Sequence, residues 1–228
     1  EENRKNGLIY SGIYNSTSGV NNLNQFIQAE KITKDLNPTF GSIQKLFQRR
    51  IDLVTFCEDR VVKVMSNKDA LYNADGNSQL IATNRVLGDA NPFAGDYGIS
   101  KDPSSFAKES YRAYFTDKQR GAVLRLSMDG LTPISDVGMH DYFRDNLRNA
   151  SNIIASYDDR NGDYNLTIDN NTLSFNEKVK GWTSFKSFVP ETGISVANNY
   201  YTFDSGRPWL HHVTTDSVTG NPVNRNTF

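Results

Sequence analysis

One hairpin pattern recurs four times along the chain, and it constrains the fold more than any other feature of the sequence. In each copy an apolar strand ends on an aromatic residue, an acidic turn follows, and an alternating strand leaves. The copies are LVTFCEDRVVKVM (53–65), RAYFTDKQRGAVLRLS (112–127), IASYDDRNGDYNLTI (154–168) and NYYTFDSGRPWLHHV (199–213). Alternation with a period of two is typical of strands in a sheet. The pattern therefore predicts antiparallel hairpins.

The spacing of the hairpins indicates a repeat. Their aromatic anchors are Phe56, Phe115, Tyr157 and Phe203, which are 59, 42 and 46 residues apart. A period of about 40 to 50 residues is typical of a four-stranded propeller blade. We therefore predict a mainly β fold, in which residues 1–228 form a single β-propeller-like domain or a fragment of a larger propeller-containing protein. A first residue of Glu1 rather than Met agrees with a fragment.

The turns and the intervening segments fit this interpretation. Gly121, Gly162 and Gly206 stand where a hairpin corner needs a positive φ, and a Val at position 121 would be strained there. Further strands are expected between the hairpins, where they would complete blades of three or four strands. These segments are 42–49, 78–87, 171–177 and 182–189.

Two segments depart from the β pattern. In 135–152, apolar residues recur at helical spacing after Ser135, a suitable N-cap, and Asp136 is favourable in a first turn. We predict a short helix inserted there between two blades. Residues 22–38 show helical spacing at Leu23, Phe26 and Ile27 but also strand-forming residues, so helix and strand both remain open.

Composition limits the classes of partner. Lys and Arg total 25 against 26 Asp and Glu, so the chain has no net positive charge to hold a nucleic-acid backbone as its main partner. No apolar run approaches the roughly 20 residues of a membrane span. Cys57 is the single cysteine, which excludes an intrachain disulfide, and its apolar setting predicts a buried packing role.

Several motifs resemble ligand sites without matching one. DKQRG (117–121) lacks the glycine spacing of a phosphate-binding loop, so Lys118 and Arg120 are expected to be solvated turn residues. His211 and His212 are adjacent and would point to opposite faces of a strand, and His140 is distant in the sequence, so we expect no zinc site. The segments 73–77 and 158–163 gather oxygen ligands but lack the calcium-loop pattern.

The sequence gives no clear signal for a catalytic site. No serine has a G-x-S-x-G context, and no carboxylate pair is singled out for glycoside hydrolysis. The acidic residues recur at hairpin corners, which indicates a role in folding. These acids are Glu58, Asp59, Asp117, Asp158, Asp159 and Asp204.

Aromatic residues are concentrated near the C-terminus. Trp182, Phe185 and Trp209 are expected to pack between blades or to anchor subunit contacts rather than to form a sugar platform. Phe188, Tyr200, Tyr201 and Phe203 lie in the same region.

Longer phrases of the sequence resemble a virion structural protein of tailed bacteriophages. These are KITKDLNPTFGSIQKLFQRRIDLVTFCEDRVVKV, DALYNADGN, YFTDKQRGAVLRLSMDGLTPISDVGM and VKGWTSFKSFVPETGISVANNYYTFDSG. The likeness is to proteins of marine phages, including cyanophages, and of crAss-like phages, and it runs from about residue 8 to the end. YDDRNGDYNLTI is distantly similar to hairpins in the propeller domains of tail nozzle and muzzle proteins. The resemblance implies a tail location with a conduit or baseplate role, and it carries over no functional residue.

We therefore expect a non-enzymatic virion component of the nozzle, muzzle or baseplate region, with no catalytic, cofactor-binding or metal-binding residue. Its expected partners are other tail proteins and further copies of itself in a ring, after synthesis in the cytoplasm of the bacterial host. The alternative is a carbohydrate-binding or glycoside-cleaving propeller that engages the host surface. A concave pocket lined by Trp or Tyr beside a close carboxylate pair would favour that alternative.

Overall fold

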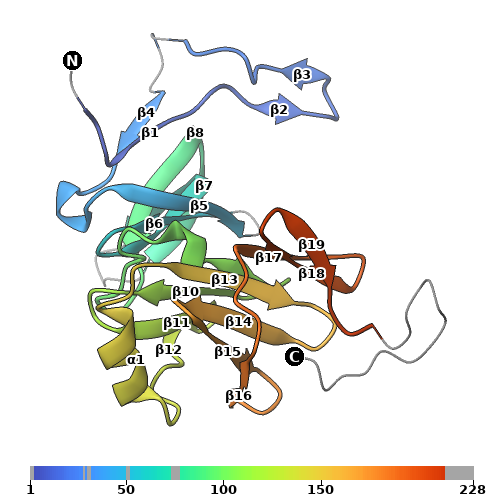
Figure 1. The fold of residues 1–228 in the computed structure, drawn as a ribbon. Coiled ribbons are helices and arrows are strands. Elements are labelled where there is room, and N and C mark those ends of the chain that lie inside the picture. Colours follow the sequence, from blue (N-terminus) through green and yellow to red (C-terminus); the bar gives the residue numbers. More distant parts are fainter. Residues whose placement is uncertain (1–2, 28, 30–31, 50–51, 73–77, 214–228) are drawn as a thin grey trace. The chain divides into compact units, whose positions relative to one another are not determined.

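The computed structural model describes residues 3–27, 29, 32–49, 52–72 and 78–213 (Figure 1). These residues form a mainly β protein with one short α-helix, as the hairpin pattern predicts. The chain divides into two compact units, Glu1–Lys101 and Asp102–Phe228. The single propeller-type domain stays a prediction. No helix in the described ranges has the length and apolar character needed to cross a membrane.

The first unit contains a four-stranded antiparallel sheet and two short strand pairs. The sheet strands follow chain order and are β5 (Ile43–Arg49), β6 (Asp52–Cys57), β7 (Val61–Tyr72) and β8 (Ser78–Pro92). The pairs are β1 (Gly7–Ile9) with β4 (Thr33–Asp35), and β2 (Tyr14–Asn15) with β3 (Val20–Asn21). The 3-10 helix η1 (Pro38–Phe40) follows β4. The described part of 22–38 therefore contains a strand and no α-helix.

Cys57 lies in the core of the first unit. Its side chain is buried in a cluster with Leu36, Val62 and Val64. Burial, with a smaller contribution from the neighbouring Glu58 carboxylate, raises the pKa of the thiol to about 11. The predicted packing role is confirmed, because a thiol with this pKa is a poor nucleophile near neutral pH.

The second unit contains three antiparallel sheets whose strands also follow chain order. The first is β9 (Ala107–Lys108), β10 (Ala113–Asp117), β11 (Ala122–Ser127) and β12 (Gly130–Pro133), and the 3-10 helix η2 (Pro103–Ser105) precedes it. The second is β13 (Ile153–Asp158), β14 (Asp163–Ile168), β15 (Asn171–Asn176) and β16 (Gly181–Lys186). The third is β17 (Thr192–Val196), β18 (Asn199–Asp204) and β19 (Arg207–Leu210). These sequential antiparallel sheets are of the propeller-blade type.

All four predicted hairpins are present, as β6–β7, β10–β11, β13–β14 and β18–β19. Three of them join the second and third strands of their sheets, whereas β13–β14 joins the first and second. This difference in position explains why Tyr157 follows Phe115 after only 42 residues. The segments expected to add strands form β5, β8, β15 and β16.

The corner glycines have the backbone conformation that was predicted. The φ angles of Gly121, Gly162 and Gly206 are 67°, 72° and 72°. A side chain is strained in this left-handed region. Only Gly121 also lies against another element: a Cβ there would be 2.7 Å from the Cα of Arg144, whereas one on Gly206 would meet no atom within 4 Å.

The predicted helix is present, but the prediction of where it begins was wrong. Helix α1 spans His140–Leu147, and its N-cap is Met139, which makes no side-chain capping hydrogen bond. Ser135 instead lies buried in a turn that ends at Gly138, whose φ is 73°. That left-handed glycine interrupts the helical path, so α1 begins one turn later than the Ser135 signal indicates.

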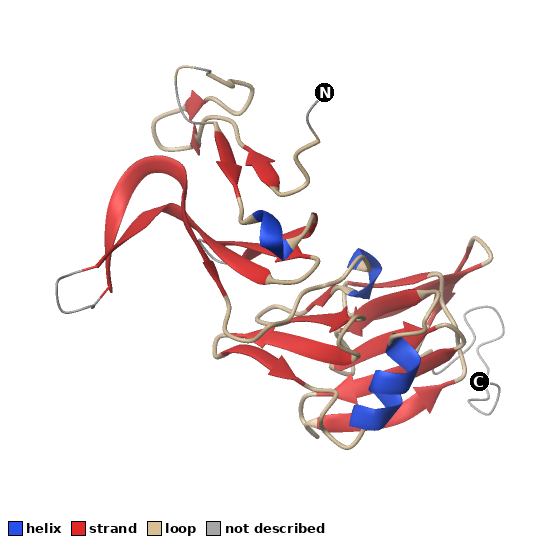
Figure 2. Cartoon of the chain, turned by 90° about the vertical axis from the view of Figure 1, so that its left-hand side faces the viewer, coloured by secondary structure: helices blue, strands red, loops and turns tan. Residues whose placement is uncertain are grey.

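Helix α1 lies beside the strands of the second unit (Figure 2). Phe143 and Leu147 are fully buried, and the Phe143 ring is 4.5 Å from the ring of Trp182 on β16. Tyr114 of β10 stacks on Tyr164 of β14, with ring centroids 4.8 Å apart. The same hydrophobic core therefore joins the helix to the first and second sheets of the unit.

A charged cluster borders this core. Arg125 of β11 donates to both carboxylate oxygens of Glu177 at 3.0 and 3.1 Å, and the Tyr114 hydroxyl donates to Glu177 at 3.0 Å. The Arg112 guanidinium contacts Glu109 at 2.9 Å and lies 3.9 Å from Glu177. Because Glu177 follows β15, this cluster ties the first sheet of the unit to the second.

Candidate assembly surface

The β17–β19 sheet presents one apolar face. Its register places Ile194 beside Tyr201 and Tyr201 beside Leu210, so these three side chains form a row across the strands. Residues two apart on a strand share a face. We call this surface the outer face, and its members are Thr192, Ile194, Val196, Asn199, Tyr201, Phe203, Pro208 and Leu210.

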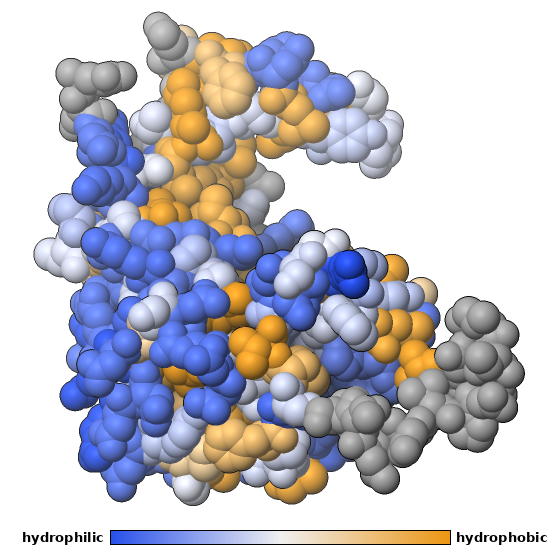
Figure 3. Space-filling view, in the orientation of Figure 1, coloured by the Kyte–Doolittle hydropathy of each residue, from blue (hydrophilic) through white to orange (hydrophobic). Residues whose placement is uncertain are grey.

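The outer face is exposed and uncharged. Ile194, Val196 and Leu210 are 52%, 53% and 45% exposed, and Tyr201 and Phe203 are half-buried. None of its eight members is Asp, Glu, Lys or Arg. In Figure 3 hydrophobic residues lie beside hydrophilic ones over the part of the molecule where β17–β19 lie. Contiguous exposed apolar patches of this kind mark interaction surfaces.

The opposite face of the sheet is fixed to β13. The hydroxyls of Tyr200 and Ser156 are hydrogen-bonded at 2.7 Å, and Ser195 donates to the Tyr157 carbonyl at 2.9 Å. Gly193 permits this close approach, because a Cβ at that position would be 2.8 Å from the Ser156 hydroxyl oxygen. The sheet is therefore anchored on one side while the outer face stays accessible.

Of the two adjacent histidines, His212 contributes to this anchoring, whereas His211 bonds within the β17–β19 sheet. His211 Nε2 lies 2.7 Å from Thr202 Oγ1, whereas His212 Nε2 lies 2.6 Å from Asp158 Oδ2 at the β13–β14 corner. Burial, together with the neighbouring His212, lowers the pKa of His211. Within the described ranges no group of three or more His, Cys, Asp or Glu residues has the arrangement of a metal site.

Of the two oxygen-rich segments, the structure describes 158–163. Asp158 accepts the backbone N–H groups of Arg160 and Asn161, so in 158–163 its carboxylate stabilises the turn as well as contacting His212. The segment 73–77 lies outside the described residues.

The three predicted aromatic anchors have different environments. Trp182 packs between Phe143 and Phe175, and its indole N–H donates to the Ile134 carbonyl at 3.0 Å. Phe185 is 61% exposed and touches Tyr142 edge-on. Trp209, which is 56% exposed, stands on β19 at the edge of the sheet. Trp182 is thus a packing residue, and the other two remain available for contacts.

The DKQRG segment is a hairpin corner with its charges paired. The buried Asp117 carboxylate accepts the backbone N–H of Arg120 at 3.1 Å and its guanidinium at 2.9 Å. Lys118 Nζ donates to the Ala150 carbonyl at 2.6 Å. The expectation of merely solvated side chains was therefore wrong, because both cations fold back onto nearby acceptors. Asp117 and Asp158 occupy equivalent corners, each four residues before a left-handed glycine, which supports the predicted folding role.

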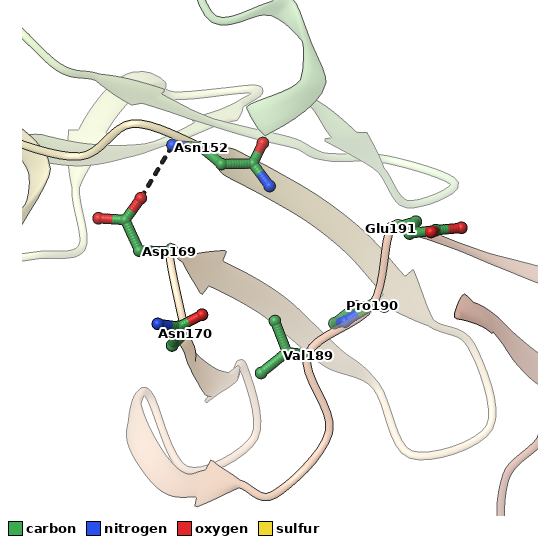
Figure 4. Close-up of a pocket in the computed structure, with 6 residues that line it drawn as sticks. All are labelled: Asn152, Asp169, Asn170, Val189, Pro190 and Glu191. Atoms are coloured by element: carbon green, nitrogen blue, oxygen red, sulfur yellow. Dashed lines mark hydrogen bonds between the residues drawn. The ribbon is translucent and has the colours of Figure 1, made fainter. Parts of the chain in front are cut away.

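A pocket of about 540 Å³ lies beside the third sheet and is drawn in Figure 4. It is lined by Asn152, Asp169, Asn170, Val189, Pro190 and Glu191. Asp169 accepts the backbone N–H groups of Ser151 and Asn152, each at 2.9 Å, so its carboxylate holds the adjoining turn. The six lining residues include no aromatic side chain on which a sugar would stack. This pocket does not have the features that the carbohydrate alternative requires.

The central row of the outer face was not identified from the sequence as a unit. The segment TGISV (192–196) alternates in polarity, but it carries no aromatic residue and no turn signal of the hairpin pattern. Only the register with β18 and β19 shows that Ile194, Tyr201 and Leu210 are neighbours. The alternation of 192–196 was the available signal.

Comparisons with known proteins give one family match. A family model described as Crassvirus muzzle protein matches residues 26–206. The sequence matches no curated protein. Among solved structures, selenomethionine-substituted virginiamycin B lyase from Staphylococcus aureus is similar with a TM-score of 0.40 and 10% identity. That alignment covers 81% of this chain and 60% of the lyase chain, and a TM-score this low indicates nothing about function.

Proposed function

The chain belongs to the Crassvirus muzzle protein family, and we propose that it works by assembly with other virion proteins in the muzzle region of the phage tail. The family has a structural role associated with the tail of crAss-like phages. We propose that the protein lies in the muzzle itself and contacts other virion proteins there. We also propose that its copies are arranged in a ring around the tail axis. The protein would be made in the cytoplasm of the bacterial host before it joins the virion.

The observation that carries this proposal is the outer face. An exposed sheet surface of eight uncharged residues, rich in Ile, Val, Leu and aromatic side chains, has the composition of the centre of a protein contact. The opposite face is fixed to β13 by hydrogen bonds from Tyr200 and Ser195. A rigidly supported apolar surface suits assembly, because little ordering entropy is lost when a partner binds.

We further propose that the protein is not an enzyme. Four carboxylates that could serve in catalysis have structural hydrogen-bond partners instead, which supports this proposal. Asp169 stabilises a turn, Asp117 and Asp158 stabilise hairpin corners, and Glu177 binds Arg125. Stabilising turns and joining sheets are contributions to a scaffold.

Cryo-electron microscopy of the intact virion tests this function. We expect density for this chain in the tail. In that density the outer face of the β17–β19 sheet should contact another protein. Antibody labelling of particles gives an independent result. Density confined to the capsid, or purified particles that lack the chain, would refute a tail role.

A further inference from the structure

We infer that the β17–β19 sheet is a hinged unit, which acid releases from β13 while the other two sheets of the second unit stay folded. At neutral pH the sheet is anchored, and on release it turns about the linker 187–191 that joins β16 to β17. The inference concerns a conformational change of the chain itself and does not rest on the proposed function.

The third sheet contributes little to the hydrophobic core. The core cluster that joins α1 to the first two sheets draws its buried members from residues 107–175. In the third sheet the buried residues are Tyr200 and Thr202, whereas every residue of β14 in the second sheet is buried. An element with few buried apolar contacts opens locally at a lower free energy than the core to which it is attached.

The contact between the second and third sheets is made largely by polar groups. Ser156 and Asn165 are buried register partners on β13 and β14, and the Ser156 hydroxyl is hydrogen-bonded to the hydroxyl of Tyr200 at 2.7 Å. The Thr172 hydroxyl donates to the carbonyl of Phe188, in the linker, at 2.6 Å. Water can replace hydrogen bonds of this kind, so opening this contact costs less than opening an apolar contact of the same size.

The linker borders open space. Val189, Pro190 and Glu191 line the pocket of about 540 Å³, whose other lining residues belong to the β14–β15 turn and to the start of β13 (Figure 4). The N–H of Glu191 donates to the Phe203 carbonyl at 2.8 Å, so Glu191 moves with the third sheet. Residues 187–190 therefore have room to change their backbone angles, as the short connecting segments of hinges do.

Acid acts on this sheet through His211. The ring of His211 lies 4.6 Å from the ring of Phe188 and 5.0 Å from that of Tyr200, and its Nε2 lies 2.7 Å from Thr202 Oγ1. Burial, with a smaller contribution from the neighbouring His212, lowers the pKa of His211 in the folded chain. The anchored sheet therefore favours neutral His211, and this contribution to anchoring is present above about pH 6.5 and is lost as the pH falls below it.

The charged and titratable groups around the two histidines come from the second sheet, its β13–β14 corner and β18. They are Asp158, Arg160, Asp163, Lys186 and Tyr200. The Asp158 carboxylate favours protonated His211 but already binds His212 Nε2 at 2.6 Å, and Lys186 disfavours it. Protonation of His212 strengthens its pair with Asp158, whereas a further proton on His211 places a second cation beside it. The two histidines thus have opposite effects, which variants can separate.

Hydrogen exchange of the purified chain at about pH 7.5 and about pH 5 tests the inference. After correction for the intrinsic exchange rate at each pH, the amides of β17 and β18 should be less protected than those of β14 and β15. Their protection should fall at least threefold at the lower pH. The upper limit is about 30-fold, because the lower pH is about 1.5 units below the ordinary pKa of histidine. The amides of β14 and β15 should keep their protection.

Glutamine variants identify the group that takes up the proton. His211→Gln keeps a hydrogen-bonding group for Thr202 but cannot be protonated, so it should lose most of the pH dependence, and His211→Asn provides a second neutral replacement. The matched control is His140→Gln, which makes the same change at a side chain that is 63% exposed, and it should respond like the wild type. In His212→Gln the acid effect should persist. Circular dichroism at both pH values establishes that the variants are folded.

Three results would each overturn the inference. The first is a third sheet as well protected as β14 and β15, and the second is protection of the third sheet that stays constant or rises at the lower pH. The third is a pH dependence that His211→Gln and His211→Asn preserve, which would assign the effect to another group. None of these results bears on whether the chain is present in the virion tail, so the proposed function is tested separately.

Discussion

Replacement of Gly121 by Ala should destabilise the second unit much more than replacement of Gly206 by Ala. Both glycines close hairpins with positive φ, at 67° and 72°. An alanine costs roughly 1 to 2 kcal/mol in this region of the backbone. At Gly121 the new Cβ would also lie 2.7 Å from the Cα of Arg144, whereas at Gly206 it would meet no atom within 4 Å.

The difference between the two variants isolates the contact between the hairpin and α1. The Arg144 atom belongs to the helix backbone, so relief of the overlap requires α1 or the hairpin to move. Overpacking of this kind costs roughly 1 to 3 kcal/mol. We expect losses in the free energy of unfolding of about 2 to 5 kcal/mol for Gly121→Ala and about 1 to 2 kcal/mol for Gly206→Ala.

Urea unfolding measures these losses, and Gly162→Ala serves as a third point. A Cβ at Gly162 would be 3.8 Å from the Tyr157 hydroxyl oxygen, an ordinary contact, so this variant should behave like Gly206→Ala. Fluorescence of Trp182, which lies against Phe143 of α1, reports displacement of the helix in a Trp209→Phe background. Equal losses at Gly121 and Gly206, with unchanged Trp182 emission, would refute the reasoning.

Three further predictions concern groups in the interior. Cys57, with its thiol pKa raised to about 11, should not react with a disulfide reagent at pH 8 until the chain is unfolded in urea; rapid reaction of the folded protein would contradict its burial. Glu177→Gln should lower the free energy of unfolding by about 1 to 3 kcal/mol, because it weakens the bonds from Arg125 and Tyr114; the control Glu109→Gln should lose less, since Arg112 is more exposed than Arg125. Burial is the leading cause that raises the pKa of five tyrosines, namely Tyr114, Tyr142, Tyr157, Tyr164 and Tyr200. Their pKa is higher in the folded than in the unfolded chain, so their contribution to stability is complete below about pH 10 and is lost as the pH rises above it. Spectrophotometric titration of the 11 tyrosines should therefore show a group that ionises late, together with unfolding. A single transition near pH 10 would contradict this prediction.

The hairpins could be predicted because their signals are local. Alternating polarity, an aromatic residue at the strand end and a glycine at the corner lie within about 15 residues of one another, and Gly121, Gly162 and Gly206 all have the expected φ. The position of each hairpin within its sheet could not be predicted. That position depends on which further strand pairs with it, and the β13–β14 hairpin differs from the other three in this respect.

Long-range contacts account for two of the other failures, and a glycine three residues from Ser135 accounts for the third. Lys118 finds its acceptor at Ala150, 32 residues away, and nothing near DKQRG indicates that partner. Ser135 has the composition of an N-cap, but the left-handed Gly138 turns the backbone before the helix begins. The outer face joins residues of three strands, so it becomes visible only when their register is known.

The proline in β19 also limits how far an assembly can grow. Proteins gathered at high local concentration risk joining sheet to sheet without end, because an open strand edge on each copy can receive the next. Pro208 removes a donor from the outward edge of β19. The substitution Pro208→Val would restore the missing donor. We expect this variant, which has lost the proline, to form fibrous aggregates rather than closed particles.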